Sequence, residues 1–96
     1  MACYLIAQIK VHDKAGYQKY LDGFDEVFRN YNGIIMAADK DPIILEGEWP
    51  HRRTVLIRFP DADEARRWYQ SPEYQRLAEV RRCASDSNIV LVRGMK

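Results

Sequence analysis

The chain has 96 residues, 47% of them hydrophobic and 30% charged, with a formal net charge of +1. This balance is typical of a folded globular protein and excludes the disordered, fibrous and low-complexity classes, and the near-neutral charge argues against a nucleic-acid partner. The length predicts a single domain over residues 1–96, and a domain this small gains from the extra burial that an oligomer provides.

The first predicted element is a strand over residues 3–12, because apolar residues occupy every second position. Its apolar face carries Cys3, Leu5, Ala7, Ile9 and Val11. The segment has neither the basic leader nor the long apolar core of a targeting peptide, and no other stretch is long enough to span a bilayer. We therefore expect a cytoplasmic protein without membrane association.

A helix is predicted next, with Asp13 as its N-cap and Asn32-Gly33 as its stop signal. Apolar and aromatic residues recur in it at steps of three and four: Tyr17, Tyr20, Leu21, Phe24, Val27, Phe28 and Tyr31. This spacing predicts an aromatic stripe that packs against the sheet.

A β-hairpin is predicted to follow the helix. Its first strand covers residues 34–38, is interrupted where Pro42 favours a bulge or an edge, and continues over residues 43–49. A turn at residues 50–53 leads to a second strand over residues 54–59. We expect the two strands to pair antiparallel.

Two further helices and a strand complete the chain. Asp61 and Glu64 have the spacing of a capping box, and Ser71-Pro72 is a cap followed by a proline suited to the first helical turn. Residues 89–93 predict the last strand, which ends at Gly94.

The predicted order corresponds to an α+β, ferredoxin-like βαββαβ fold, a four-stranded antiparallel sheet with its helices on one face. The uncovered face is predicted to carry Tyr4, Ile6, Ile44, Leu56, Ile89 and Leu91. This is too much apolar surface to leave in water, so we expect a homodimer that packs sheet to sheet as an α+β barrel.

Short motifs spread over nearly the whole chain carry a family resemblance. They are Tyr17, Tyr20, Gly33, Leu45-Glu46-Gly47, Trp49, Phe59-Pro60, Ala65, Trp68-Tyr69, Ser71-Pro72-Glu73-Tyr74, Arg81 and Val92-Arg93-Gly94. Together they resemble family 1330 of the domains of unknown function, within the dimeric α+β barrel superfamily, although the family pattern has Glu-Gly at Arg93-Gly94. The resemblance implies the fold and the dimer. Relatives in the superfamily include cofactor-independent monooxygenases, lactone isomerases and haem-binding enzymes, with pockets between sheet and helices, so fold alone names no reaction.

Arg81 is the sharpest local anomaly, because helical spacing from Pro72 places it in the middle of an apolar stripe. Burying a guanidinium is costly unless it is paired, so Arg81 should have a specific partner or face a polar cavity. A structural ion pair is one interpretation, and binding of an anionic ligand is the other.

Glu46 is the second anomaly, since it lies within the apolar run of a predicted strand and beside Gly47. If the two strands of the hairpin pair so that Glu46 and Arg58 lie on the same face, Arg58 is the expected partner of Glu46. A structural Glu46–Arg58 pair and a role for Glu46 as a base are the alternatives.

Aromatic side chains are the remaining candidates for a ligand site. Trp49, Trp68, Tyr69 and Tyr74 are predicted to form either the wall of a pocket for a planar molecule or part of the core.

Histidine and cysteine patterns narrow the chemistry. His12 and His51 lie near predicted strand ends, where each is either a general base or an exposed loop residue, and neither has the context of a haem ligand. Cys3 and Cys83 are too far apart in sequence for metal spacing and are predicted to be free thiols. We expect no metal site and no cofactor, since the chain also lacks a phosphate-binding glycine loop and a nucleophile elbow.

These observations predict a homodimer that binds a small anionic or aromatic organic molecule between sheet and helices. The residues proposed to bind it are Glu46, Trp49, Arg58, Trp68, Tyr74 and Arg81. The alternative is a cofactor-independent enzyme, monooxygenase-like or isomerase-like, with Glu46, His12 or His51 as base and Arg81 stabilising negative charge. A ligand-free structural dimer is the third interpretation.

Overall fold

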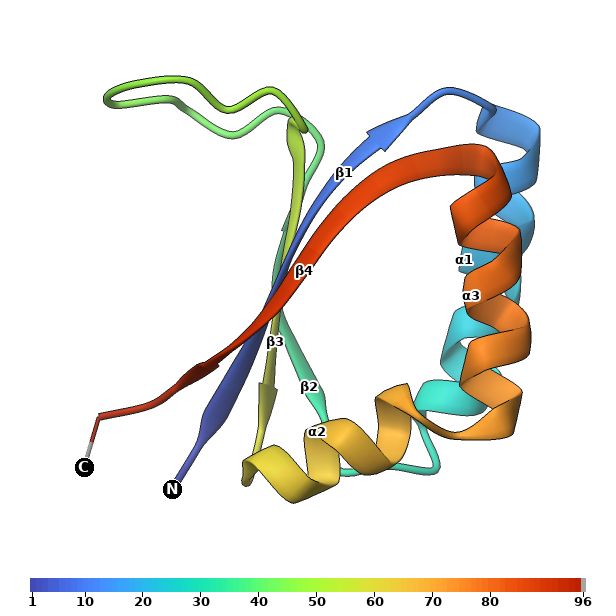
Figure 1. The fold of residues 1–96 in the computed structure, drawn as a ribbon, viewed down its shortest axis with the longest axis vertical. Coiled ribbons are helices and arrows are strands. Elements are labelled where there is room, and N and C mark those ends of the chain that lie inside the picture. The colour runs from blue at the N-terminus through green and yellow to red at the C-terminus, as the bar shows by residue number, and fades with distance from the viewer. Residues whose placement is uncertain (96) are drawn as a thin grey trace.

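The computed structural model describes residues 1–95 and contains four strands and three helices in that range (Figure 1). In chain order they are β1 (Cys3–Val11), α1 (Lys14–Phe28), β2 (Ile34–Asp39), β3 (Arg53–Phe59), α2 (Ala62–Tyr69), α3 (Pro72–Ala84) and β4 (Ser85–Arg93). Within residues 1–95, none of the helices has the length and apolar composition that crossing a bilayer requires.

The strands form one antiparallel sheet in the order β2-β3-β1-β4. Figure 1 shows α1 and α3 side by side over one face of this sheet, with α2 at the end where β3 finishes. The predicted ferredoxin-like α+β fold is therefore confirmed. We call the helix-covered side of the sheet the covered face and the other side the open face.

The core lies between the covered face and the helices. Side chains of β1 alternate as predicted, and its five apolar-face positions from Cys3 to Val11 point toward the helices. Phe59, Trp68 and Tyr74 close one end of the core and are almost entirely buried. An aromatic core supplies much of the apolar burial available to so short a chain.

Helix α1 begins where the sequence predicts but ends earlier. The Asp13 carboxylate accepts a hydrogen bond from the Gly16 N–H at 3.1 Å, which confirms the N-cap. The helix stops at Phe28 and not at Asn32-Gly33. Beyond it, the Tyr31 hydroxyl donates to Glu73 at 2.7 Å, so contacts with the later helices replace the expected last turn.

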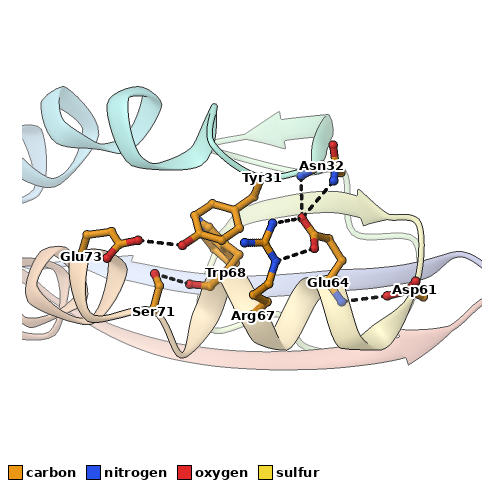
Figure 2. A network of polar contacts seen from close by, with 8 residues as sticks. All are labelled: Tyr31, Asn32, Asp61, Glu64, Arg67, Trp68, Ser71 and Glu73. Atoms are coloured by element: carbon orange, nitrogen blue, oxygen red, sulfur yellow. Dashed lines mark hydrogen bonds and ion pairs between the residues drawn. The ribbon is translucent and has the colours of Figure 1, made fainter.

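Only half of the predicted capping box forms at α2. The Asp61 carboxylate accepts the Glu64 N–H at 2.8 Å, but the Glu64 carboxylate accepts hydrogen bonds from Arg67 and Asn32 instead of turning back to Asp61 (Figure 2). Ser71 caps α3 as predicted, because its hydroxyl oxygen accepts the N–H of the third helical residue at 3.2 Å.

The predicted strand over residues 43–49 is wrong, because residues 40–52 form a long excursion, here called the arm. Figure 1 shows the arm extending from the sheet on the side away from α1 and α3. The Asp39 carboxylate accepts the Asp41 N–H at 2.9 Å and turns the chain out of the sheet, and the Asp41–Arg52 ion pair closes the base of the arm. The irregularity in β2 lies at Met36, not at Pro42.

The predicted composition of the open face is partly wrong. In the observed register Leu91 is opposite Leu5, and Ile89 is opposite Ala7, so both belong to the covered face. Val90 and Val92 face the open side in their place, while Ile44 lies in the arm. Which side chains of β4 face the helices is fixed at Ser85, where α3 passes directly into the strand.

Candidate functional site

A cavity of about 130 Å³, here called the chamber, lies between the covered face of the sheet and the helices. Its wall is mostly apolar and consists of Leu5, Ala7, Ile9, Tyr17, Tyr20, Leu21, Phe24, Ile35, Ala38, Arg53, Val55, Ile57, Trp68, Arg81 and Ile89. An apolar cavity with a few polar side chains is the usual form of a small-molecule site.

Arg81 is the most unusual residue of the chamber wall. It is only 3% exposed, as the spacing in α3 predicted. One terminal guanidinium nitrogen donates to the Ser87 hydroxyl at 3.0 Å, and the guanidinium carbon lies 5.9 Å from the centre of the Tyr20 ring. Within residues 1–95, the Arg81 Nε–H has no hydrogen-bond acceptor. The predicted partner is thus a hydroxyl group, not a carboxylate.

Trp68 carries a second buried donor. It belongs to α2, is 1% exposed, and packs at 5.6 Å from Phe59 and 4.1 Å from Tyr74, measured between ring centres. In the described part of the chain its indole Nε1–H finds no acceptor. Buried N–H groups are nearly always paired, so two such exceptions on one cavity wall call for an explanation.

Tyr20 and Tyr74 form a hydroxyl pair behind the chamber wall. Their hydroxyl oxygens are 2.8 Å apart and buried. Burial raises the pKa of both phenols above the ordinary value, so both stay protonated. Tyr74 was predicted to contact the ligand, but it supports Tyr20 from behind, and only Tyr20 belongs to the wall.

Arg53 is a wall residue that the sequence interpretation missed. It begins β3 on the covered face, opposite Ile9, and its guanidinium carbon lies 5.0 Å from the centre of the Tyr17 ring. Residues 50–53 were expected to form a turn. Extending the alternation of Val55, Ile57 and Phe59 by one step would have placed Arg53 on the covered face.

Glu46 and Arg58 are not brought together. Glu46 is exposed in the arm, whereas Arg58 lies on the open face, opposite Tyr4 and Ile34. The predicted pair is therefore wrong, because it depended on a strand that does not form. Neither side chain reaches the chamber.

The predicted aromatic wall is divided. Trp49 lies in the arm, where its indole donates to the Thr54 hydroxyl at 2.9 Å, and it borders a separate hollow formed with Ile43 and Leu45. Tyr69 packs against Trp68 and Tyr74, with ring centres 6.2 and 5.6 Å apart. Only Trp68 of the four belongs to the chamber wall.

The histidines lie outside the chamber. His12 is exposed just after β1, and His51 is near the end of the arm. Within residues 1–95 no carboxylate or imidazole contributes to the chamber wall, and no cluster of three or more His, Cys, Asp or Glu residues is arranged to hold a metal ion. The wall residues with polar side chains are therefore potential hydrogen-bond donors: Tyr17, Tyr20, Arg53, Trp68 and Arg81.

Solved structures with this fold were found by comparison of the whole chain. A protein of unknown function from Rhodopseudomonas palustris has a TM-score of 0.81 at 14% identity, with 99% of this chain and 83% of that chain covered. A dimeric ferredoxin-like protein of unknown function from Jannaschia has a TM-score of 0.78 at 9% identity, covering 98% and 100%.

SnoaB, a cofactor-independent oxygenase from Streptomyces nogalater, has a TM-score of 0.68 at 18% identity, covering 99% of this chain and 94% of its own. Identities this low show a shared fold alone. None of the curated proteins matches the chain. A family model described as a domain of unknown function, DUF1330, matches residues 2–95.

Proposed function

Because this chain belongs to the DUF1330 family, whose function is unknown, we propose from its own chamber that it binds a small anionic or aromatic organic molecule. One observation carries the proposal: Arg81 lies on the chamber wall with its guanidinium group buried, and within residues 1–95 it pairs with no carboxylate and its Nε–H has no acceptor. Leaving a buried donor unpaired costs about 1–3 kcal/mol, and more when the group is charged. An acceptor oxygen bound beside the Arg81 guanidinium group offsets that cost.

The volume of the chamber limits the size of the molecule. An apolar cavity of about 150 Å³ accommodates benzene, and this chamber measures about 130 Å³. A single ring or a short branched chain with one polar group fits that space. A larger polycyclic molecule exceeds this volume.

A second copy of the chain is proposed as the partner. The open face exposes Ile34, Val90 and Val92, and the arm exposes Ile43 and Leu45 almost fully, at 87% and 93%. Exposed large apolar side chains in this number favour an interface. The Jannaschia protein with the same fold is dimeric, which supports a homodimer of this chain that packs sheet to sheet.

A thermal-shift screen tests ligand binding. Wild-type protein and Arg81→Met are melted with small carboxylic acids, phenols, lactones and haem. A ligand present at about 100 times its Kd stabilises the native state by about 2.7 kcal/mol, which corresponds to a rise in Tm of about 10 °C or more for a chain of this size. We expect a hit among the acids or phenols that Arg81→Met loses.

Arg82→Met is the matched control, since Arg82 is the next residue on α3 but is exposed and pairs with Glu79. This variant should keep the hit. If no compound raises the Tm of the wild-type protein and Arg81→Met melts no lower than wild type, the ligand-free structural dimer replaces this proposal.

Cofactor-independent oxygenation is a second candidate function. The similarity to SnoaB, and to a putative antibiotic biosynthesis monooxygenase from Caulobacter crescentus, favours it. Glu46, His12 and His51 lie off the wall, so a substrate that is already ionised, such as an electron-rich phenolate, suits the chamber better than one that needs a base. Oxygen consumption with hydroquinones is the assay, and a rate equal in wild type and Arg81→Met would contradict this function.

A further inference from the structure

Two guanidinium groups stand at the same end of the chamber. Arg53 comes from the sheet and Arg81 from α3, and they lie over neighbouring rings: Arg53 at 5.0 Å from the Tyr17 ring and Arg81 at 5.9 Å from the Tyr20 ring. The two rings are themselves 5.6 Å apart. Opposite layers of the fold thus bring two positive charges to one short stretch of the wall.

These charges are not neutralised by the part of the chain that the structure describes. Ion pairs within residues 1–95 involve other arginines: Arg52, Arg66, Arg67 and Arg82. The chamber wall itself has no aspartate or glutamate in that range. A buried guanidinium without an anion is unfavourable, so this end of the chamber attracts one.

The positive charges of Arg53 and Arg81 both act on the Tyr17 side chain. Burial raises the pKa of the Tyr17 phenol, while the positive charges of Arg53 and Arg81 both lower it. A negative charge beside the Tyr17 ring is therefore favoured by both arginines. The planar guanidinium group suits a carboxylate in particular, because two parallel N–H donors match its two oxygens.

The other end of the chamber is apolar. Arg53 begins β3 and Phe59 ends it, so the two positions are roughly 20 Å apart along the strand. Trp68, which packs against Phe59, belongs to the apolar end, and Val55 and Ile57 line the wall between the ends. The chamber thus has a cationic end and an aromatic end.

We infer that the chamber selects a monocarboxylate with a single ring or short branched chain, its carboxylate held between Arg53 and Arg81 and its apolar body directed toward Trp68. This inference rests on the proposed ligand-binding function and adds the ligand class, its orientation and Arg53 as a specificity-determining residue. Recognition of the charged head by two arginines means that a neutral molecule of the same shape binds poorly.

Isothermal titration with a matched pair of probes tests this inference. Benzoate and benzamide share a ring and a planar head group but differ in charge. We expect wild-type protein to bind benzoate at least about tenfold more tightly than benzamide. Arg53→Met should remove most of that preference by weakening benzoate alone, and Arg53→Lys should restore only part of it, because lysine lacks the planar fork.

Arg52→Met is the control variant, since Arg52 is the adjacent residue, pairs with Asp41 and lies outside the chamber wall. It should keep the full preference for benzoate. Arg81→Met should also lose the preference for benzoate. If Arg81→Met does not fold, the inference is tested by Arg53→Met together with the salt dependence of benzoate binding.

The outcomes separate this inference from the proposed function. Equal binding of benzoate and benzamide by wild-type protein, or an unchanged preference in Arg53→Met, would contradict the inference that Arg53 and Arg81 hold a carboxylate. Either result leaves the proposed ligand-binding function standing. If wild-type protein binds neither these probes nor any compound of the thermal-shift screen, both the inferred carboxylate site and the proposed function are wrong.

Discussion

Polar groups on the wall of the chamber and just behind it differ in whether they have hydrogen-bond partners. Tyr20 and Tyr74 satisfy each other through one buried hydrogen bond, with 2.8 Å between their hydroxyl oxygens. Arg81 and Trp68 have buried N–H donors without acceptors in the described chain. A satisfied hydroxyl pair that supports the fold thus lies beside two residues with unsatisfied buried donors.

The tyrosine pair gives a prediction at this scale. Tyr20→Phe leaves the Tyr74 hydroxyl buried without its partner, so we expect the free energy of unfolding to fall by about 1–3 kcal/mol. The double variant Tyr20→Phe/Tyr74→Phe should lose less than the sum of the single variants, because no unpaired hydroxyl remains. Urea unfolding at fixed protein concentration measures both effects.

Tyr69→Phe is the control, since the half-buried Tyr69 packs in the same aromatic cluster but its hydroxyl group forms no hydrogen bond within residues 1–95. Its effect should stay within about 0.5 kcal/mol. Strictly additive losses in Tyr20→Phe and Tyr74→Phe would show that the hydroxyl pair contributes nothing to stability.

The position of a single site residue could be predicted from the sequence only where the residue lies inside a regular helix or strand pattern. The spacing of α3 predicted that Arg81 is buried, and the structure confirms it. Glu46 and Trp49 were assigned to the site from a strand that does not form. Arg53 was missed because a residue at the boundary of a turn and a strand has no periodic pattern of its own.

At the scale of elements, α2 holds the segment that joins α1 to β2. The Glu64 carboxylate accepts hydrogen bonds from Arg67 and from the Asn32 N–H, at 2.8 and 2.9 Å (Figure 2). These bonds, those from Arg67 first, lower the pKa of Glu64 to about 2. The carboxylate thus stabilises the fold only while it is ionised.

This gives a pH-dependent prediction. The folded pKa is below the unfolded one, so the contribution of Glu64 is complete above the unfolded pKa, near pH 4.5, and is lost as the pH falls toward 2. Wild-type protein should therefore be more stable than Glu64→Gln at pH 7, and the difference should shrink below about pH 4. Urea unfolding of both proteins across this range measures it.

Asp63→Asn is the matched control on the same helix, because the Asp63 carboxylate is exposed and lies 3.6 Å from Arg66. Exposed pairs of this kind contribute little. A stability difference between wild type and Glu64→Gln that stays constant from pH 7 to pH 2 would contradict the role of the ionised carboxylate.

The arm shows why one element was predicted wrongly. Its run Ile43-Ile44-Leu45 has the composition of a buried strand, yet Ile43 and Leu45 are nearly fully exposed. Strand propensity mostly reflects packing against neighbours on a sheet. Within residues 1–95 the arm pairs with no strand, because the chain leaves the sheet after Asp39.

For the whole molecule, the proposed homodimer uses the open face and the arm. We predict that Val90→Asp, which places a charge on the open face, converts the proposed homodimer to a monomer or weakens it strongly, since burying an unpaired carboxylate is costly. Light scattering after size exclusion measures the molar mass. Lys19→Asp, on the exposed side of α1, is the control and should leave the mass unchanged.

The chamber lies on the covered face and the proposed interface on the open face, so the two can be tested separately. A monomeric Val90→Asp protein that still binds benzoate would show that one copy holds a complete site. A wild-type protein that is monomeric at all concentrations would contradict the sheet-to-sheet dimer.

Sequence by itself determined the order of strands and helices, the covered face of β1, the caps at Asp13 and Ser71, and the burial of Arg81, because these follow from short-range periodicity and capping chemistry. Only the tertiary structure decided which side chains of β4 face the helices, where the arm leaves the sheet, and that Arg53 and Arg81 both lie on the chamber wall. Those features depend on strand register and on packing between layers, which bring together residues that are distant in the chain.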